Sequence, residues 1–212
     1  MGDINMDIRL SPYSNNVEVY GISMGLLTMT DYKVTGLQIS GICNTVDTLH
    51  GIQMSLFGNE SQYAYGGKLA LIVNANGYEM YGISIAGLAN FFGDNIIGWQ
   101  CAGLLNFNGN VTGIQTTLGV NASINRYGQM TGMQIAGLAN LASNVDGIQM
   151  ALLFNKVGED MNGVQVGLVN CAKKVRGVQI GLYNTTDDLQ WIQIGLLNSK
   201  RGRLFPCIMI GL

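Results

Sequence analysis

The feature that most constrains this chain is a short phrase that recurs along almost its whole length. Each copy opens with glycine and continues with an apolar residue, glutamine and a second apolar residue, as in Gly36-Leu37-Gln38-Ile39 and Gly163-Val164-Gln165-Val166. The intervals between openings are 14 to 16 residues, apart from one of 19. A fixed short period predicts stacked units that bury their apolar residues only as an array. The openings are Gly21, Gly36, Gly51, Gly67, Gly82, Gly98, Gly113, Gly132, Gly147, Gly163 and Gly177, with Trp191 and Cys207 in the last two units.

Two further positions of the repeat are nearly constant. An apolar residue stands two places before each opening, from Val19 to Phe205, and this rule places Tyr65 in the core. Asparagine stands seven or eight places after the opening, as at Asn59 and Asn155. Since identical amides on stacked strands lie about 4.8 Å apart, we expect them to form hydrogen-bonded ladders.

The alternation around the glutamine predicts strands rather than helices. We expect one corner at the glycine, which tolerates unusual backbone angles, and a second at the asparagine, which accepts the left-handed conformation. In this interpretation the apolar neighbours of the glutamine point inward. A substitution such as Val164→Asp should therefore be more damaging than Gln165→Ser.

These patterns predict an all-β protein, a single parallel β-solenoid of about 13 coils with repeats of 14 to 16 residues. The alternative is an antiparallel β-barrel with one strand per unit. We expect a cap or lead-in segment over residues 1–18, the tandem-repeat solenoid over 19–198 and a terminal repeat or cap over 199–212.

The phrases GLQISGICN, GMQIAGLAN, GVQVGLVN and GVQIGLYN resemble those of bacterial surface-repeat proteins, a family of exported proteins built from short Gly-Leu-Gln-Ile-Gly-Leu-x-Asn units. The resemblance covers nearly the whole chain and implies a place at the cell surface or secretion. It supplies no catalytic residues. The start of the chain lacks the apolar core of a signal peptide, so a cytoplasmic location stays open as an alternative.

Composition and motifs favour a non-enzymatic protein without cofactor or metal. Charged residues make up 11% of the chain and the formal net charge is -2, which gives no field to attract nucleic acid. The single histidine, His50, has neither a metal cluster nor a catalytic triad around it in the sequence. The four cysteines lack zinc-type spacing and are expected to be incidental thiols.

Two segments are candidates for partner binding. Tyr63, Tyr78 and Tyr81 are expected to form an exposed aromatic patch suited to protein or glycan contact. The long interval predicts a protruding loop from Ser123 to Gly128, with Ser123, Arg126 and Tyr127 as contact residues.

We therefore expect a non-catalytic repeat scaffold that presents a binding surface to a macromolecular partner, with protein as the first choice. A membrane-inserted β-barrel or pore is the alternative function. Membrane contact and end-to-end self-association are open as further interactions. Six of the eleven basic residues lie near the C-terminal end, where they either oppose stacking on the last coil or meet an acidic partner or lipid head groups. They are Lys173, Lys174, Arg176, Lys200, Arg201 and Arg203.

Overall fold

The computed structural model describes residues 7–124 and 128–211, which form β-strands, turns and bends without a helix. The chain divides into two compact units, Met1–Gly103 and Leu104–Leu212. The first contains β1 (Asp7–Ser55), β2 (Gly58–Ala70), β3 (Val73–Ala86), β4 (Ala89–Phe92) and β5 (Asn95–Ala102). The second contains β6 (Leu105–Asn108), β7 (Asn110–Thr117), β8 (Val120–Ser123), β9 (Gln129–Ala136), β10 (Ala139–Ala142), β11 (Asn144–Ala151), β12 (Phe154–Val166), β13 (Val169–Ile180), β14 (Tyr183–Thr186), β15 (Asp188–Lys200) and β16 (Arg203–Gly211).

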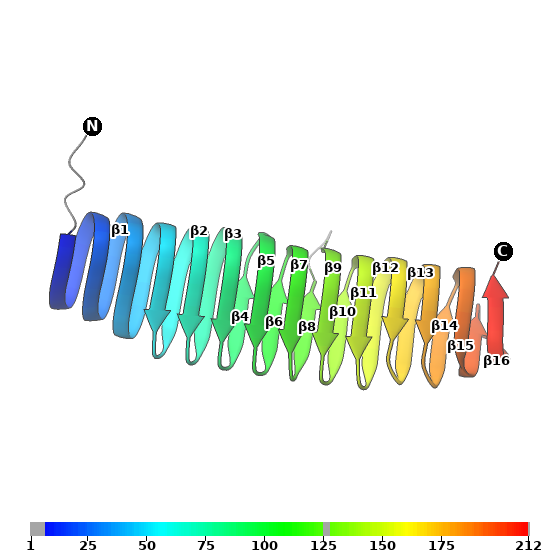
Figure 1. Ribbon diagram of the computed structural model, residues 1–212. Helices are drawn as coiled ribbons and strands as arrows, with labels where there is room; N and C mark the ends of the chain where they lie inside the picture. Colours follow the sequence, from blue (N-terminus) through cyan, green and yellow to red (C-terminus); the bar gives the residue numbers. More distant parts are fainter. Residues whose placement is uncertain (1–6, 125–127, 212) are drawn as a thin grey trace. The chain divides into compact units, whose positions relative to one another are not determined.

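Within each unit the chain winds in coils that pair in parallel with the coils before and after them (Figure 1). In the first unit Asn59 lies opposite Asn44 on one side and Asn74 on the other. In the second unit Gln149 lies between Gln134 and Gln165 in the same way. The predicted parallel β-solenoid is therefore confirmed, and the antiparallel barrel is wrong because these neighbouring strands run in the same direction.

The glycine that opens each phrase forms one corner of the coil, as predicted. Gly51 has φ 144°, and a Cβ atom added there would lie 1.9 Å from the carbonyl oxygen of Gly36. Both the backbone angle and the close approach of the neighbouring coil therefore require glycine. Trp191 is the exception, with φ 108° in the last parallel coil.

One corner lies a residue earlier than the repeat predicts. Gly66, rather than Gly67, is aligned with Gly51 and Gly82. The inward apolar residue of this coil is consequently Ala64, whereas Tyr65 is 39% exposed. The placement of Tyr65 in the core was wrong because two adjacent glycines leave the register ambiguous in the sequence.

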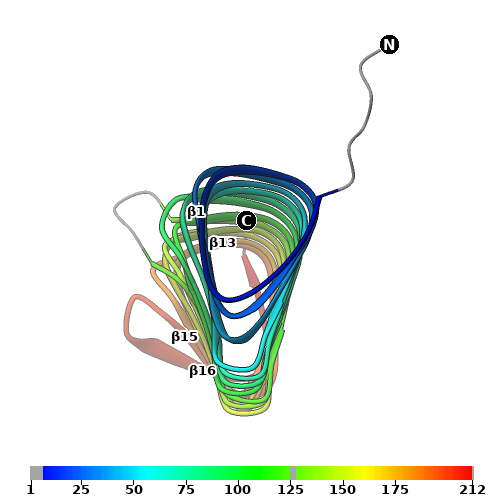
Figure 2. The same cartoon turned by 90° about the vertical axis from the view of Figure 1, so that its left-hand side faces the viewer.

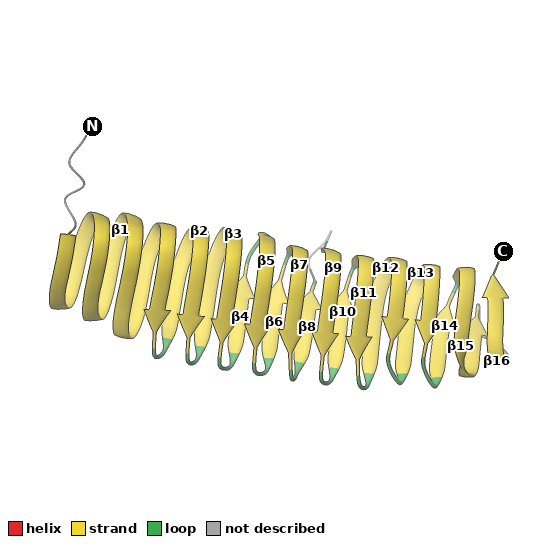
Figure 3. Cartoon of the chain, in the orientation of Figure 1, coloured by secondary structure: helices red, strands yellow, loops and turns green. Residues whose placement is uncertain are grey.

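The second corner is not at the asparagine. The coil reverses at a bend just before it, at residues 56–57 and 71–72 of the first unit, and these turns are green in Figure 3. We call this turn the tip of the coil. Seen along the stack in Figure 2, the coils of the first unit narrow toward the tip. Asn59 and Asn74 are buried in extended strands, where their side chains bond across coils instead of forming a turn.

The predicted assignment of inside and outside around the glutamine is reversed. Gln165 is fully buried, whereas Val164 is only half-buried on the outer surface. The inward positions are the apolar residue two places before the corner, the glutamine, the small residue two places after it, and the asparagine. Polar amides can occupy this interior because each finds partners in the neighbouring coils.

The last predicted unit does not continue the parallel stack. After a turn at Arg201 and Gly202, β16 pairs antiparallel with β15. Eleven glycines and Trp191 form the corners ahead of β16 in the described residues, so the coils number about 12 rather than 13. The strand β1 already begins at Asp7, within the segment expected as a lead-in.

Candidate functional site

The asparagines form a hydrogen-bonded ladder inside each unit. In the first unit Asn59 Nδ2 donates to Asn74 Oδ1 at 2.9 Å and to the carbonyl oxygen of Leu69 at 2.8 Å. In the second unit Asn140 Nδ2 donates to Asn155 Oδ1 at 2.9 Å and to the carbonyl oxygen of Met150 at 2.8 Å. Each asparagine side chain thus joins its own coil to the next one. It bonds to the next asparagine and to the strand that approaches the next tip.

A second ladder is formed by the glutamines of the second unit. Gln149 Nε2 donates to Gln134 Oε1 at 2.7 Å, and Gln165 Nε2 donates to Gln149 Oε1 at 2.9 Å. The column runs without interruption through six coils by bonds of the same kind. Its members are Gln115, Gln134, Gln149, Gln165, Gln179 and Gln193. These amides hydrogen-bond to one another, with Gln193 Oε1 at the end of the column left without a partner. The column therefore supports the coil and does not present a surface site.

The same column in the first unit holds a buried lysine. Lys68 stands opposite Gln53 and Ser84 and is 2% exposed. Its Nζ donates to the carbonyl oxygen of Ala75 at 2.6 Å and to Asn76 Oδ1 at 3.1 Å. Burial lowers the pKa of Lys68 to about 7. The amine is enclosed by its own coil, and Gln53 Oε1 has no hydrogen-bond partner.

The outer surface of each coil is divided by charge. We call the stretch from the corner glycine to the residue before the asparagine the apolar half. In the coils whose side chains are described, Lys68 is the one charged residue within this stretch, and it points inward. Exposed charges lie in the remaining part of the coil, as at Glu60, Asp94 and Asp146. We call that part the charged edge.

Leucines project from the tips in both units and form what we call the tip ridge. Leu118 is 80% exposed and Leu152 is 72% exposed, which is unusual for side chains of this size in a repeated row. The ridge consists of Leu56, Leu71 and Leu88 in the first unit and Leu104, Leu118, Leu138, Leu152, Leu168, Leu182 and Leu196 in the second.

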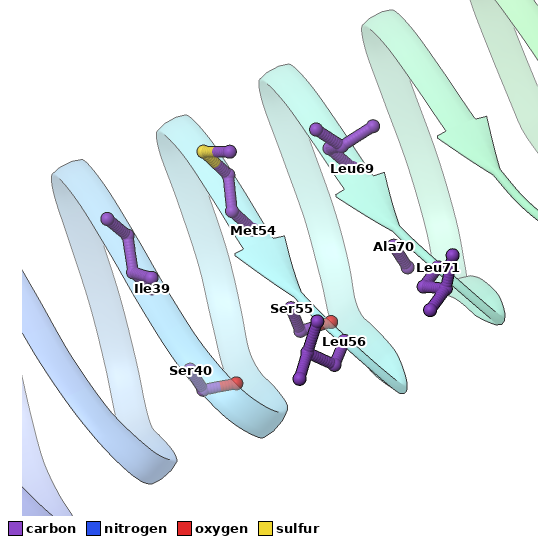
Figure 4. Close-up of a pocket in the computed structure, with 8 residues that line it drawn as sticks. All are labelled: Ile39, Ser40, Met54, Ser55, Leu56, Leu69, Ala70 and Leu71. Carbon is purple, nitrogen blue, oxygen red and sulfur yellow. The ribbon is translucent and has the colours of Figure 1, made fainter.

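A shallow apolar groove runs beside the tip ridge in the first unit (Figure 4). One row of side chains along it is formed by Ile39, Met54 and Leu69, and the ridge leucines Leu56 and Leu71 lie on the other side. Small residues lie between the two rows. The groove has a volume of about 400 Å³.

The second unit has a groove of the same construction. Val166, Ile180 and Ile194 line it together with ridge leucines such as Leu168 and Leu182. Its volume is about 670 Å³. The small residues between the two rows are Ala151, Gly167, Gly181 and Gly195. Sequence reasoning missed both grooves because it placed the residues of their outer rows inside the coil.

The predicted tyrosine patch is present as two separate stacks. Tyr63 and Tyr78 stack with ring centroids 5.4 Å apart. Tyr81 stacks on Tyr65 at 5.3 Å, and Tyr65 in turn stacks on His50 at 4.8 Å. Within each stack the neighbouring rings cover faces on which a sugar could otherwise stack.

The three candidate residues of the predicted loop, Ser123, Arg126 and Tyr127, fall into two groups. Ser123 is fully buried, with its Oγ 3.2 Å from Gln115 Oε1 and accepting from Gln134 Nε2 at 3.1 Å. Its assignment as a contact residue is therefore wrong, since the inward parity of β8 carries it into the interior. Arg126 and Tyr127 lie outside the described residues.

Several of the C-terminal basic residues meet acidic residues of a neighbouring coil. Lys173 Nζ lies 2.8 Å from Glu159 Oε2, and this exposed hydrogen bond raises the pKa of Lys173. Lys174 Nζ lies 3.8 Å from Asp160 Oδ1. The charged edge of the second unit is therefore of mixed sign, which does not match a uniformly acidic partner.

Reactive groups do not gather on the described surface. Cys43, Cys101, Cys171 and Cys207 are free, and burial raises the pKa of Cys43 and Cys171. No three metal-binding side chains come together among the described residues. A search of the same residues finds no helix of the length and apolarity that crossing a membrane requires.

The fold and surface define a parallel β-solenoid with an amide interior, an apolar half and a charged edge. Comparison with protein-family models, with curated proteins and with solved structures finds no match. Function is therefore inferred from the surface of the chain itself.

Proposed function

We propose that the chain is a non-catalytic repeat scaffold that binds a macromolecular partner through its apolar half. The observation that carries this proposal is the division of the coil by charge, because every described coil keeps exposed charges off the same stretch. Contiguous exposed apolar surfaces of this kind mark interaction sites in folded proteins. The resemblance to exported surface-repeat proteins supports a surface or secreted scaffold.

The interior supports this proposal over a pore. Side-chain amides and small residues fill the coil and bond with one another, as Gln134 and Gln149 do. A transported solute would have to break these bonds. Binding at the outer surface leaves the interior intact.

Capture experiments with two matched variants test the proposal. The ridge variant carries Leu152→Ser, Leu168→Ser and Leu182→Ser, and the edge variant carries Lys173→Gln, Lys174→Gln and Arg176→Gln in neighbouring coils. Each is used as bait with native lysate and envelope fractions. We expect the ridge variant to lose the captured material and the edge variant to retain it. Equal capture by a folded ridge variant would contradict the assignment of the surface.

A further inference from the structure

We infer that the partner of the apolar half is a lipid bilayer, with the tip ridge entering the acyl region and the charged edge staying in water. This inference rests on the proposed function and names the chemistry of its partner. Four properties of the coil support it: the order of side chains away from the tip, the bonding of the backbone at the tip, the shape of the ridge, and the grooves beside it.

Side chains on the first unit change in character with distance from the tip. Leu71 projects from the tip itself, and Leu69 follows on the strand that leads back to the corner. Nearer the corner Trp99 is 41% exposed, and beyond it come the stacked rings of Tyr65 and Tyr81. Along this strand aliphatic residues therefore lie nearest the tip and amphipathic aromatic residues farther back, and charges are confined to the rest of the coil, where Glu60 comes three residues after the tip bend at 56–57. This order matches the layers of a membrane surface, where tryptophan and tyrosine favour the head-group level.

The backbone near the tip is hydrogen-bonded between coils. In the first unit the amide of Leu71 donates to the carbonyl oxygen of Ser55 at 3.3 Å, and that of Leu88 donates to Ile72 at 3.0 Å. In the second unit the amide of Leu182 donates to the carbonyl oxygen of Leu168 at 2.9 Å. An unpaired peptide group is costly in hydrocarbon, so these bonds remove a main obstacle to burying the ridge in lipid.

The shape of the tip favours lipid over a second copy of the chain. The coils of the first unit narrow toward the tip in Figure 2, so the leucines stand on a convex ridge. Two ridges that meet tip to tip would touch only along a narrow line, whereas a symmetric dimer requires a broad self-complementary surface. Fluid acyl chains can close around a ridge.

The grooves offer a place for individual acyl chains. In the second unit the groove follows successive coils between an aliphatic row and the ridge, and glycine or alanine lies between them. A straight apolar channel with small residues along its middle fits an extended hydrocarbon chain. A peptide laid there would leave its own backbone groups without partners, because the lining is almost entirely aliphatic.

Co-sedimentation of the full chain with vesicles of phosphatidylcholine alone tests the inference. We expect the parent and the edge variant to bind about equally, and the ridge variant to partition at least about tenfold more weakly. Binding should be nearly unchanged between about 0.1 M and 1 M salt, because exposed charges do not take part. Weak binding by the edge variant, or its loss at high salt, would show that charges carry the contact and overturn the inference.

Fluorescence gives a second measurement that needs no change to the ridge. Trp191→Phe leaves Trp99 as the remaining tryptophan. We expect its emission to shift to shorter wavelength on adding vesicles and to be quenched by lipids brominated high on the acyl chain. Unchanged emission together with an unbound parent would refute lipid docking. If the ridge variant still lost captured protein in the lysate experiment, the apolar half would remain a binding surface with a protein partner.

Discussion

The two units keep the same outer surface over different interiors. In the second unit an unbroken glutamine column crosses six coils. In the first unit Lys68 and Ser84 interrupt the same column. Ser84 Oγ bonds to Asn90 Oδ1 at 2.7 Å instead, and Lys68 turns to Ala75 and Asn76. The coil therefore tolerates different interior residues, even though the interruption leaves Gln53 Oε1 without a hydrogen-bond partner.

The comparison also identifies which features are independent of the interior. The corner glycines, the asparagine ladder and the tip leucines recur in both units. Corner and ladder are required for winding, as the contacts of Gly51 and Asn59 show. An exposed leucine at the tip is not required for winding, since it contributes little burial. Its recurrence over two different interiors supports a role at the surface.

The largest expected effect comes from breaking a feature that the units share. Gly147 has φ 144°, and an added Cβ would lie 2.0 Å from the carbonyl oxygen of Gly132. Gly147→Ala should therefore lower the free energy of unfolding of the second unit by about 4 kcal/mol or more, measured by denaturant titration of Trp191 fluorescence. Gly202 has φ 75° with no atom within 4 Å of an added Cβ, so Gly202→Ala is the matched control and should cost only about 1 kcal/mol. Equal losses would show that backbone angle rather than coil contact dominates.

A smaller loss of stability is expected from substitutions that compare a buried residue of the second unit with its outward-facing neighbour. Gln165 Nε2 donates to Gln149 Oε1, and Gln165 Oε1 accepts from Gln179 Nε2 at 2.6 Å. Gln165→Leu leaves both neighbours without these bonds and should cost about 3 kcal/mol. Val164→Asp, on the adjacent outward position, should cost about 1 kcal/mol or less.

Thermal denaturation of the two variants by circular dichroism checks this order. It is the reverse of the order that the sequence predicts, because the sequence interpretation assigned Val164 to the interior. A greater loss for Val164→Asp than for Gln165→Leu would contradict the burial of the glutamine column.

Repeat, strand type and parallel stacking could be predicted because period and composition determine them. A corner glycine and amides at fixed places in so short a repeat are compatible with few folds other than one coil per repeat. The choice of inward face could not be made from hydrophobicity, since alternation defines two faces without saying which is enclosed. A signal was nevertheless present. Small residues such as Ala86 and Ala136 stand four places after the corner, on the same parity as the glutamine and the inward apolar residue.

The candidate surface was harder to predict than the fold. Tyr78 and Tyr81 are exposed and Tyr63 is half-buried. Their stacking depends on the register between coils, which the sequence leaves ambiguous at Gly66 and Gly67. The grooves are lined by outward-facing residues. A prediction that places those residues inside the coil therefore cannot find the grooves. The leucines that carry the proposed contact belong to the regular repeat, so no irregularity in the sequence distinguishes them from structural positions.

The last expected effect is gradual in pH and concerns the residue that makes the interiors differ. The pKa of Lys68 is lowered from 10.5 to about 7 by burial, and Glu60 offsets this only in part. Between these values the unfolded chain holds a proton that the folded chain has released. The stability of the first unit should therefore rise with pH from about 7 to about 10.5, by up to about 1.4 kcal/mol per pH unit. Below about pH 7 the folded chain is protonated as well, and this dependence ends.

Lys68→Gln should remove that dependence and stabilise the first unit. The new amide can donate to Gln53 Oε1, which lacks a partner, and can reach the carbonyl oxygen of Ala75 much as Gln53 Nε2 reaches that of Glu60 at 3.4 Å. We expect a gain of about 5 kcal/mol near pH 7 that shrinks to about 2 kcal/mol by pH 10, because only the hydrogen-bond part of about 1 kcal/mol is independent of pH. Denaturant titrations of Trp99 fluorescence at several pH values, in a Trp191→Phe background, measure it. A parent and a variant with parallel stability profiles over this range would show that the lysine keeps its proton inside the coil, and that the difference between the two interiors is one of hydrogen bonding alone.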